Sequence, residues 1–583
     1  MGTQEGRYDV LVLGGGLAGL TLALQLKRAR PDTSIAVAEK RVGPAPEAAF
    51  KVGESTAEPS AHYFREVLSM GGHLRKQQLR KAGLRFFFPS GDNSDITHRV
   101  EYGSQFYAPV ATYQLDRGRL ENELAERCRA SGVDVLDGAF VNEIELGDDT
   151  HAATIVRGGP GGERSRLEGR WLVDAAGRSF LLKRKLGLEQ EVGHTINAAW
   201  FRLRNGIEVD KWADDPGWLA RVDVPGLRQF STNHLMGEGY WVWMIQLASG
   251  PISIGIVADP RFHPFDTFND FDKALAWIGE HEPQLAGVLE QRRDELEDFL
   301  KIENFAHGAK QVYSADRWVT TGEAGVFSDP LYSPGSDFIS YSNTLVTDLV
   351  TRDLDGEDIA ERAERHNREY LRFFEIALSY YEDQYRFYGN PQVMIPKLMW
   401  DHTTYWGYYS LLFLRDKMQD LEFMAAIEPE TVRFGELMRR TQGFFREWHE
   451  LSSQEWAGVA IGPYNVDFLV EIFGDLAQPF TDAELKAKIR QDLERCEGIA
   501  VAVFAKAASQ LPNAQSFTDV KINPYAISLD PKRWEADGLF DPPGLTPAEA
   551  RALVPGYELS FIDELGESPE LKHFFTTQGV VAG

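Results

Sequence analysis

The sequence predicts an α/β protein that opens with a β-α-β unit, continues through a strand-rich region and ends in a mostly helical region. "YDVLVL" is an apolar run typical of a buried strand, and glycines follow it at once. "LAGLTLALQLKRA" then has apolar residues at helical spacing and ends in basic residues, and "SIAVAEK" is a second apolar run that ends in an acid. This order of elements indicates a β-α-β unit, as at the start of a Rossmann-like domain.

The rest of the chain changes character twice. From about residue 86 to 255 the pattern is strand-like, with a helix expected at "RGRLENELAERCRASG", and beyond about residue 343 it is helical and rich in aromatic residues. We expect one domain over residues 1–345, with an embedded antiparallel sheet at about 86–115 and 190–315. Residues 346–583 are expected to form a helical domain that covers the substrate site. "HAATIVRGGPGGERSRLEGRWLVDAAG" predicts a hairpin, because no helix with apolar spacing follows its glycines.

Composition excludes several classes of protein. The 583 residues are 43% hydrophobic and 26% charged, which excludes a largely disordered chain. A net charge of -27 argues against nucleic acid or an anionic membrane as a partner. Two cysteines, Cys128 and Cys496, cannot build a disulfide framework or a zinc site. With no signal-peptide pattern and no long apolar run, we expect a cytoplasmic protein without a metal site.

A glycine loop follows the first predicted strand. Gly14, Gly16 and Gly19 form G-x-G-x-x-G, and Leu17 and Ala18 lie where the helix begins. The first glycine allows a tight turn, the second allows the backbone to approach a pyrophosphate, and the third allows the helix to pack on the strand. The helix N-terminus then offers N–H groups and a positive dipole.

An acid completes this pattern. Glu39, followed by Lys40, comes 20 residues after Gly19, where an acid binds ribose hydroxyls. The glycine loop, the two strands that flank it, the helix and the acid together predict a dinucleotide site.

Three further segments favour FAD over NAD. "KVGES" at 51–55 supplies a second glycine turn with Gly53, Glu54 and Ser55. Arg117 precedes a helix, although an exposed arginine at a helix start is the alternative interpretation. "WLVDAAGRS" is a strand that runs into a small-residue turn, with Asp174 and Gly177. A second fingerprint for a nicotinamide cofactor is not visible in the sequence.

In order along the chain, these segments resemble the flavin-dependent halogenases, relatives of the single-component FAD monooxygenases, over roughly residues 8–345. That family has a W-x-W-x-I-P motif on a strand near the flavin, read here as "WVWMIQ" with Trp241 and Trp243. The resemblance implies that the two indoles make the flavin side bulky and apolar; the alternative is that they only fill a core. The match is incomplete, because Gln246 stands where the family has proline.

A second family segment is D-P-L-x-S-x-G, present as "DPLYSPG" from Asp329 to Gly335, with Tyr332, Ser333 and Pro334, followed by Ser336. It comes after "TTGEAGVF", which has Glu323 where the family has aspartate. A glycine turn before a helix offers N–H groups and a dipole to an anion, and the resemblance implies chloride or bromide.

Two departures bear on that site. In the tryptophan-halogenating members, the halide rests on N–H groups of the residues matching Pro334 and Gly335, and proline has none, so Ser336 or another donor has to substitute. Those members carry a glutamate at the position of Tyr332. The resemblance therefore favours an electron-rich phenol or pyrrole over tryptophan as the substrate.

The family also uses a lysine about 25 residues after the glycine-glutamate turn. Lys81 in "KAGLRFFF" matches that position, and Lys76 is its rival within a basic run that otherwise suggests a solvated face. In the family, hypohalous acid formed at the reduced flavin from oxygen and halide passes through the protein to this lysine. Such a role requires a lysine in a dry passage, where burial lowers its pKa.

Three functions remain open. The first is FADH2- and O2-dependent halogenation of an aromatic small molecule, free or tethered to a carrier protein, as in secondary metabolite biosynthesis. It implies a separate NAD(P)H flavin reductase and no nucleic acid or membrane partner. The second is a flavin monooxygenase or oxidase of the same fold that uses no halide, which Pro334 and Gln246 favour. The third is a flavoprotein that serves only as a binding module, for which Glu323 is the hint.

Overall fold

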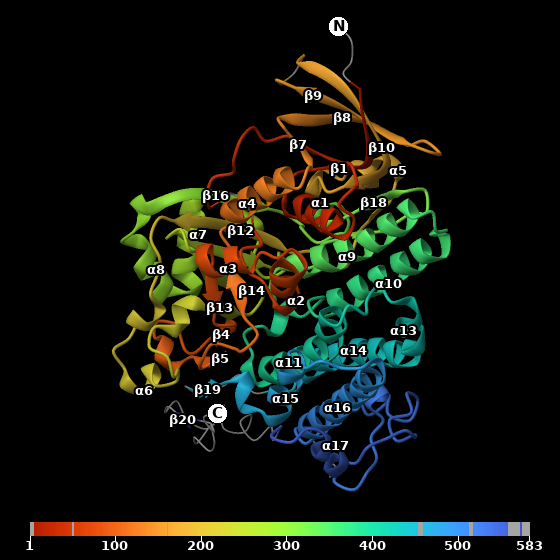
Figure 1. Ribbon diagram of the computed structural model, residues 1–583. Coiled ribbons are helices and arrows are strands. Elements are labelled where there is room, and N and C mark those ends of the chain that lie inside the picture. The colour runs from red at the N-terminus through yellow and green to blue at the C-terminus, as the bar shows by residue number, and fades with distance from the viewer. Residues whose placement is uncertain are drawn as a thin grey trace.

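The structure is a computed structural model that describes residues 5–48, 52–159, 161–452, 459–511, 517–557 and 572–573. Two large sheets and a group of C-terminal helices follow one another from the N-terminal end of the molecule towards the opposite end (Figure 1). The predicted class, an α/β flavoprotein-type domain with an inserted sheet and a helical C-terminal region, is confirmed.

The first sheet contains the predicted β-α-β unit. β1 (Glu5–Leu13) lies parallel to β2 (Ile35–Glu39), and α1 (Leu17–Ala29) connects them. The valines and leucines of β1 are fully buried, which is the burial expected of a strand covered on both faces. The strand order is β7-β2-β1-β10-β9-β8, with β18 beside β10. The other strands are β7 (Asp134–Asp137), β8 (Ala139–Glu145), β9 (His151–Arg157), β10 (Glu163–Asp174) and β18 (Trp318–Thr320). β9 and β10 pair antiparallel, so the predicted hairpin is confirmed.

The second sheet has the order β16-β12-β15-β14-β13-β4-β5-β19-β20 and is antiparallel except at β13–β4, β5–β19 and β19–β20. Its strands are β4 (Leu84–Phe88), β5 (Val100–Gly103), β12 (Asn197–Leu203), β13 (Thr232–Gly237), β14 (Tyr240–Gln246), β15 (Ile252–Ala258), β16 (Leu296–Ile302), β19 (Val459–Ile461) and β20 (Lys572–His573). The C-terminal region therefore contributes strands to this sheet, which the sequence did not predict.

Two short pairs lie outside the large sheets. β3 (Leu79–Lys81) pairs antiparallel with β6 (Thr112–Gln114), and β11 (Glu189–Gln190) pairs with β17 (Gly308–Ala309). The helices of the first 300 residues are α2 (Glu58–His62), α3 (Gly71–Gln77), α4 (Arg117–Ala130), α5 (Leu181–Leu186), α6 (Pro216–Leu219), α7 (Phe271–His281) and α8 (Pro283–Glu290).

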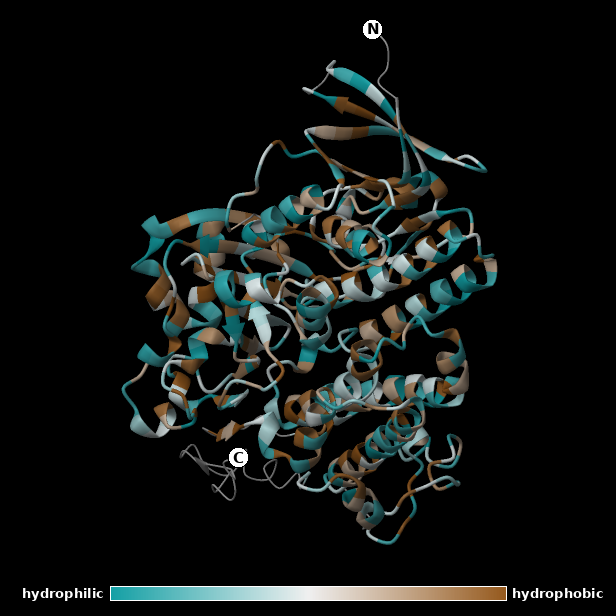
Figure 2. Ribbon diagram, viewed as in Figure 1, coloured by the Kyte–Doolittle hydropathy of each residue, from teal (hydrophilic) through white to brown (hydrophobic). Residues whose placement is uncertain are grey.

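The C-terminal helices lie beside and below the second sheet, and the first of them packs on α1 (Figure 1). They are α9 (Gly335–Leu354), α10 (Ala360–Ser379), α11 (Pro391–Thr404), α12 (Leu411–Leu414), α13 (Leu421–Ala426), α14 (Glu428–His449), α15 (Asp467–Asp475), α16 (Asp482–Ala508) and α17 (Pro547–Leu553). Several of them, such as α10 and α16, carry hydrophilic and hydrophobic residues along their length (Figure 2). The boundary predicted at residue 345 falls inside α9, and the division into domains stays a prediction. Within the described part of the chain, we find no helix that combines the length and apolarity needed to span a bilayer.

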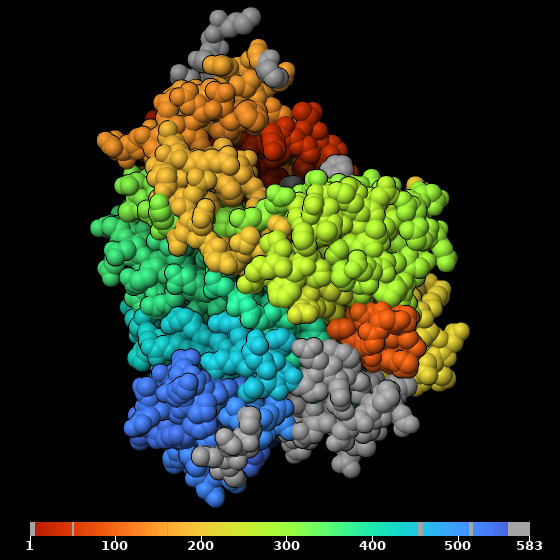
Figure 3. All heavy atoms as spheres, turned by 180° about the vertical axis from the view of Figure 1, so that it is seen from behind, coloured from red at the N-terminus to blue at the C-terminus, as the bar shows by residue number. Residues whose placement is uncertain are grey.

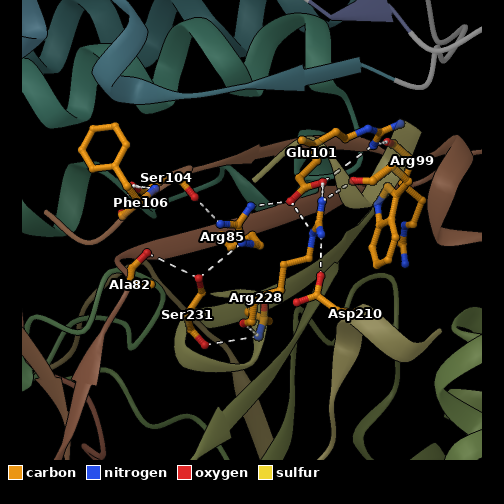
Figure 4. Close-up of polar contacts among 12 residues, drawn as sticks. Ala82, Arg85, Arg99, Glu101, Ser104, Phe106, Asp210, Arg228 and Ser231 are labelled. Atoms are coloured by element: carbon orange, nitrogen blue, oxygen red, sulfur yellow. Dashed lines mark hydrogen bonds and ion pairs between the residues drawn. The ribbon is translucent and has the colours of Figure 1, made fainter. Parts of the chain in front are cut away.

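A buried ion cluster ties the start of β4 to β5 and to the segment before β13 (Figure 4). Arg85 and Arg228 both bind the carboxylate of Glu101, and Arg228 also pairs with Asp210. Three arginines around Glu101 hold its pKa at about 2, even though burial alone would raise it. Arg85 also donates to the hydroxyl of Ser231. The cluster thereby fixes the backbone immediately after β3, the strand that ends at Lys81.

Candidate active site

A cavity of about 790 Å³ lies between the two sheets, and loops at the carboxyl ends of β1, β2 and β10 form one side of it. From behind, the N-terminal residues, coloured red, lie in a recess between the orange and the yellow-green parts of the chain (Figure 3). Strand ends of a parallel sheet are where α/β folds bind dinucleotides.

The glycine loop has the geometry that a pyrophosphate requires. Gly14 has a φ of +114°, and a Cβ there would lie 2.4 Å from the carbonyl oxygen of Ala175. A Cβ at Gly19 would lie 2.0 Å from the carbonyl oxygen of Gly14, so the helix packs on the loop only with glycine at this position. Glu39 accepts a hydrogen bond from the Gly15 N–H at 2.7 Å, which holds the acid at the edge of the cavity. These residues fit the dinucleotide part of FAD.

The second glycine turn also lines the cavity. Arg117 donates from Nη1 to the carbonyl oxygen of Val52 at 2.6 Å and from Nη2 to Glu121 at 2.8 Å. Glu54 binds Arg202 at 2.6 Å, and burial raises the pKa of its carboxyl despite this arginine. Arg117 is thus a buried residue that shapes the cavity rather than an exposed helix-start arginine. Lys51 lies outside the described residues.

The structure brings most of the predicted residues to the cavity and places six outside its lining. The lining includes Gly14, Gly16, Leu17, Ala18, Glu39, Lys40, Gly53, Glu54, Ser55, Arg117, Gly177, Trp241, Trp243, Ser333, Gly335 and Ser336. Gly19, Lys81, Asp174, Asp329, Tyr332 and Pro334 do not line it.

Asp174 and Asp329 do not line the cavity but form hydrogen bonds with groups next to it. Asp174 accepts hydrogen bonds from the N–H groups of Ala176 and Leu182, at 3.0 and 2.8 Å, and so orders the turn after β10. Asp329 is fully buried and accepts from Tyr385 at 2.6 Å, with His194 at 2.8 Å. Both aspartates are therefore placed to orient the backbone around the cavity.

Trp241 and Trp243 lie on the same face of β14, and both line the cavity. Their ring centroids are 5.8 Å apart, and Trp241 donates its indole N–H to the hydroxyl of Tyr385. Both indoles are also part of the main hydrophobic core. They form an apolar wall and fill a core at once. Gln246 ends this strand and donates to carbonyl groups of the following turn, which a proline could not do.

The "DPLYSPG" segment leads into the first turn of α9. Ser333 has a φ of +62°, Pro334 precedes the helix, and Gly335 and Ser336 line the cavity at its N-terminus. The first N–H groups of a helix have no partner within the helix, so those of Gly335 and Ser336 are directed out of its end. Glu323 also borders the cavity and lies 3.6 Å from Arg178.

Tyr332 points away from the cavity into a buried polar cluster of the helical region. Its hydroxyl donates to Asp401 at 2.7 Å, and Asp401 also binds Lys397 and Gln442. Burial raises the pKa of Asp401 and lowers that of Lys397. Neither Lys397 nor Asp401 was predicted from the sequence, where no local pattern marks these polar residues of α11 as buried.

The structure separates the two candidate lysines. Lys76 is exposed at the end of α3, whereas Lys81 is 4% exposed. The Lys81 ammonium donates to Ser55 Oγ at 2.7 Å and to the Thr56 carbonyl oxygen at 3.0 Å. Burial lowers its pKa to about 8, against the opposing effects of Glu58 and Asp337. Because Ser55 lines the cavity, a single side chain separates this amine from it.

His234 is a cavity residue that the sequence did not predict. It stacks on Phe86 at 4.5 Å, lies 5.3 Å from Trp241 and is 1% exposed. Burial lowers its pKa to about 3, so its ring is neutral near pH 7. β13 pairs with β14 so that His234 lies opposite Trp243. Without this pairing, strand alternation alone does not show that His234 faces the cavity.

The fold and the cavity define an FAD-dependent oxidoreductase. The family model described as an FAD binding domain matches residues 7–246. The chain is 26% identical over 433 residues to the flavin-dependent halogenase chlA of Dictyostelium discoideum. The aligned part is 69% of this chain and 70% of that protein. It is 23% identical over 400 residues to a 1H-pyrrole-2-carbonyl-(peptidyl-carrier protein) chlorinase of Pseudomonas fluorescens, covering 64% and 83% of the two chains.

Solved structures agree in fold. The crystal structure of halogenase PltM with phloroglucinol and FAD superposes with a TM-score of 0.61 at 15% identity, over 84% of this chain and 96% of that chain. The chain is therefore similar to flavin-dependent halogenases in sequence and in fold. The predicted enzyme class and the FAD cofactor are thereby confirmed.

Proposed function

We propose that this protein uses reduced FAD, oxygen and chloride or bromide to halogenate an electron-rich aromatic molecule of phenol or pyrrole type. FAD would supply the oxidising chemistry when bound, held by the glycine loop, Glu39 and the turn at Gly53. The observation that carries the proposal is the position of Lys81, which is buried and hydrogen-bonded to a cavity residue.

Lys81 is suited to receive hypohalous acid. Its ammonium can donate a hydrogen bond to the oxygen of that acid and so make the halogen more electrophilic. Because its pKa is about 8, the amine form is also accessible near neutral pH. The apolar wall of Trp241 and Trp243 keeps a substrate on the lysine side from entering the flavin cavity.

The halide is proposed to bind at the N-terminus of α9. Gly335 and Ser336 supply N–H groups there, together with the dipole of a 20-residue helix. Ser336 then takes the place of the donor that Pro334 lacks.

Both substrate types have support among the relatives. One relative acts on a pyrrole-2-carbonyl group held by a carrier protein, and PltM is seen with phloroglucinol, a phenol. A separate flavin reductase and either a free or a carrier-tethered substrate are parts of the same proposal.

The test is an assay of the purified protein with FADH2, oxygen, bromide and either phloroglucinol or a carrier-bound pyrrole-2-carbonyl thioester. Mass spectrometry should find a brominated product with at least one of them, and the product should disappear when bromide is omitted. Pro334 favours one alternative, a monooxygenase of the same fold. Hydroxylated product without bromine, in the presence of bromide, would select that alternative and overturn the proposal.

A further inference from the structure

Two carboxyl groups stabilise the charged form of Lys81, and they belong to different helices. Glu58 is the first residue of α2, two positions after Thr56, whose carbonyl oxygen binds the lysine. Asp337 lies in the first turn of α9, directly after the proposed halide site. Both raise the pKa of Lys81 against the effect of burial. An amine and two acids therefore share one buried region.

The surroundings of the two acids differ. Asp337 is 2% exposed, and both of its oxygens have fixed donors, the Ser60 N–H at 3.0 Å and the Tyr405 hydroxyl at 2.6 Å. Glu58 is only partly buried and accepts from its own backbone N–H and from the indole of Trp406. A carboxylate has about four lone-pair directions, so each acid has accepted two of about four possible hydrogen bonds. Glu58 differs from Asp337 in being the more exposed of the two.

The region around Glu58 is aromatic. Trp406 is 3% exposed and stacks on Tyr464, with the ring centroids 6.2 Å apart and the planes at 17°. The titratable groups that act on Glu58 or are acted on by it are Lys81, Asp337, Tyr341, Tyr405 and Tyr464. Lys81 is the cation among these groups. The indole of Trp406 donates to Glu58, so an aromatic ring, a carboxylate and an ammonium lie in the same region, a combination that suits an aromatic molecule with an acidic O–H.

We propose that Glu58 is the base that accepts the hydroxyl proton of a phenolic substrate while Lys81 presents the halogen to its ring. This inference rests on the proposed function and narrows its substrate class to arenes with an ionisable hydroxyl group. It also supplies the carboxylate that Tyr332, directed towards Asp401, does not provide.

Atoms and protons balance in the following step. Glu58 takes the phenol proton, and the electron-rich ring carbon bonds to the halogen of hypohalous acid as the halogen–oxygen bond breaks. The departing hydroxide takes a proton from the Lys81 ammonium and leaves as water. The ring then loses its C–H proton to the Lys81 amine, and Glu58 returns its proton to the phenolate oxygen. Burial raises the pKa of Glu58, which strengthens it as a base.

The test compares two arenes that differ by one methyl group, 3,5-dimethoxyphenol and 1,3,5-trimethoxybenzene, in the FAD-loaded enzyme with bromide. Glu58→Gln removes the base and keeps the shape. We expect bromination of the phenol to fall about 100-fold, within the range typical of general-base catalysis. Bromination of the ether, which has no hydroxyl proton to lose, should stay within about twofold of the wild type. Glu58→Asp should recover part of the activity on the phenol.

The matched control is Glu66→Gln, an exposed position on the same segment that should change neither rate. Retained FAD binding, measured by quenching of flavin fluorescence, shows that the variants are folded. If Glu58→Gln slowed bromination of both arenes equally, or did not slow bromination of the phenol, the proposed role of Glu58 would be wrong while the proposed function would stand. If the wild type brominated neither arene nor the substrates of the previous assay, the proposed function would fail instead.

Discussion

The flavin cavity is shaped mainly by the main chain, whereas the region around Lys81 is shaped mainly by side chains. At the cavity, main-chain geometry dominates, with a positive φ at Gly14, a close approach at Gly19 and N–H groups at the start of α9. Around Lys81, side chains from α2, α9 and the segment at residues 405–406 meet in a buried region. The predicted cofactor site thus depends on the backbone, whereas the proposed substrate region depends on side chains.

The largest expected effect comes from breaking the backbone side of this contrast. Gly19→Ala places a Cβ 2.0 Å from the carbonyl oxygen of Gly14, so the loop has to move away from the pyrophosphate position. We expect FAD affinity to fall more than 100-fold in a fluorescence titration. Gly279→Ala, at a helical glycine with no atom near the added Cβ, should bind FAD like the wild type. Unchanged affinity in Gly19→Ala would contradict the importance of this close approach.

The buried side-chain cluster around Asp401 should lose stability when its cation is removed. Lys397→Met leaves Asp401 without its cation while Tyr332 and Gln442 still surround it. Removing one partner of a buried ion pair costs about 3–5 kcal/mol, and we expect a loss of that order in urea unfolding. Lys211→Met, which removes an exposed pair with Glu208, should cost less than about 1 kcal/mol. Equal losses would show that the Lys397 cluster contributes no more than a surface pair.

A smaller effect should appear in the pH dependence of stability. Burial raises the pKa of Asp337 from 3.8 to about 7, so the folded protein binds a proton that the unfolded chain has released. This contribution to stability is fully present below about pH 4 and is lost as the pH rises through 7. Asp337→Asn, which imitates the protonated acid, should raise Tm by about 1–3 °C at pH 8 and change it little at pH 5. A gain that is the same at both pH values would contradict the shifted pKa.

The same contrast explains what the sequence could predict. The β-α-β unit, the glycine loop and the hairpin at residues 151–174 depend on local spacing, and the sequence predicts all three. Glu58, His234 and the Lys397–Asp401 pair acquire their meaning only from contacts between distant segments, and no local pattern marks them. The strand pairing of β5 with β19 is equally hidden, since its partners lie more than 350 residues apart.

Lys81 was predicted only through its position relative to the glycine-glutamate turn. Spacing could not distinguish a buried amine from the exposed Lys76 five residues earlier. Burial is a property of the folded chain, and it depends on β3 pairing with β6 and on the ion cluster around Glu101.

The central claim is that oxidant made at the flavin is used at Lys81, and Lys81→Met tests it most directly. The variant and its control Lys76→Met are supplied with a flavin reductase, NADH, oxygen, bromide and phloroglucinol, and oxygen consumption is measured together with brominated product. We expect Lys81→Met to bind FAD and consume oxygen within about twofold of the wild type but to form no brominated phenol, while Lys76→Met forms it normally. Normal bromination by Lys81→Met would show that the oxidant does not act through Lys81.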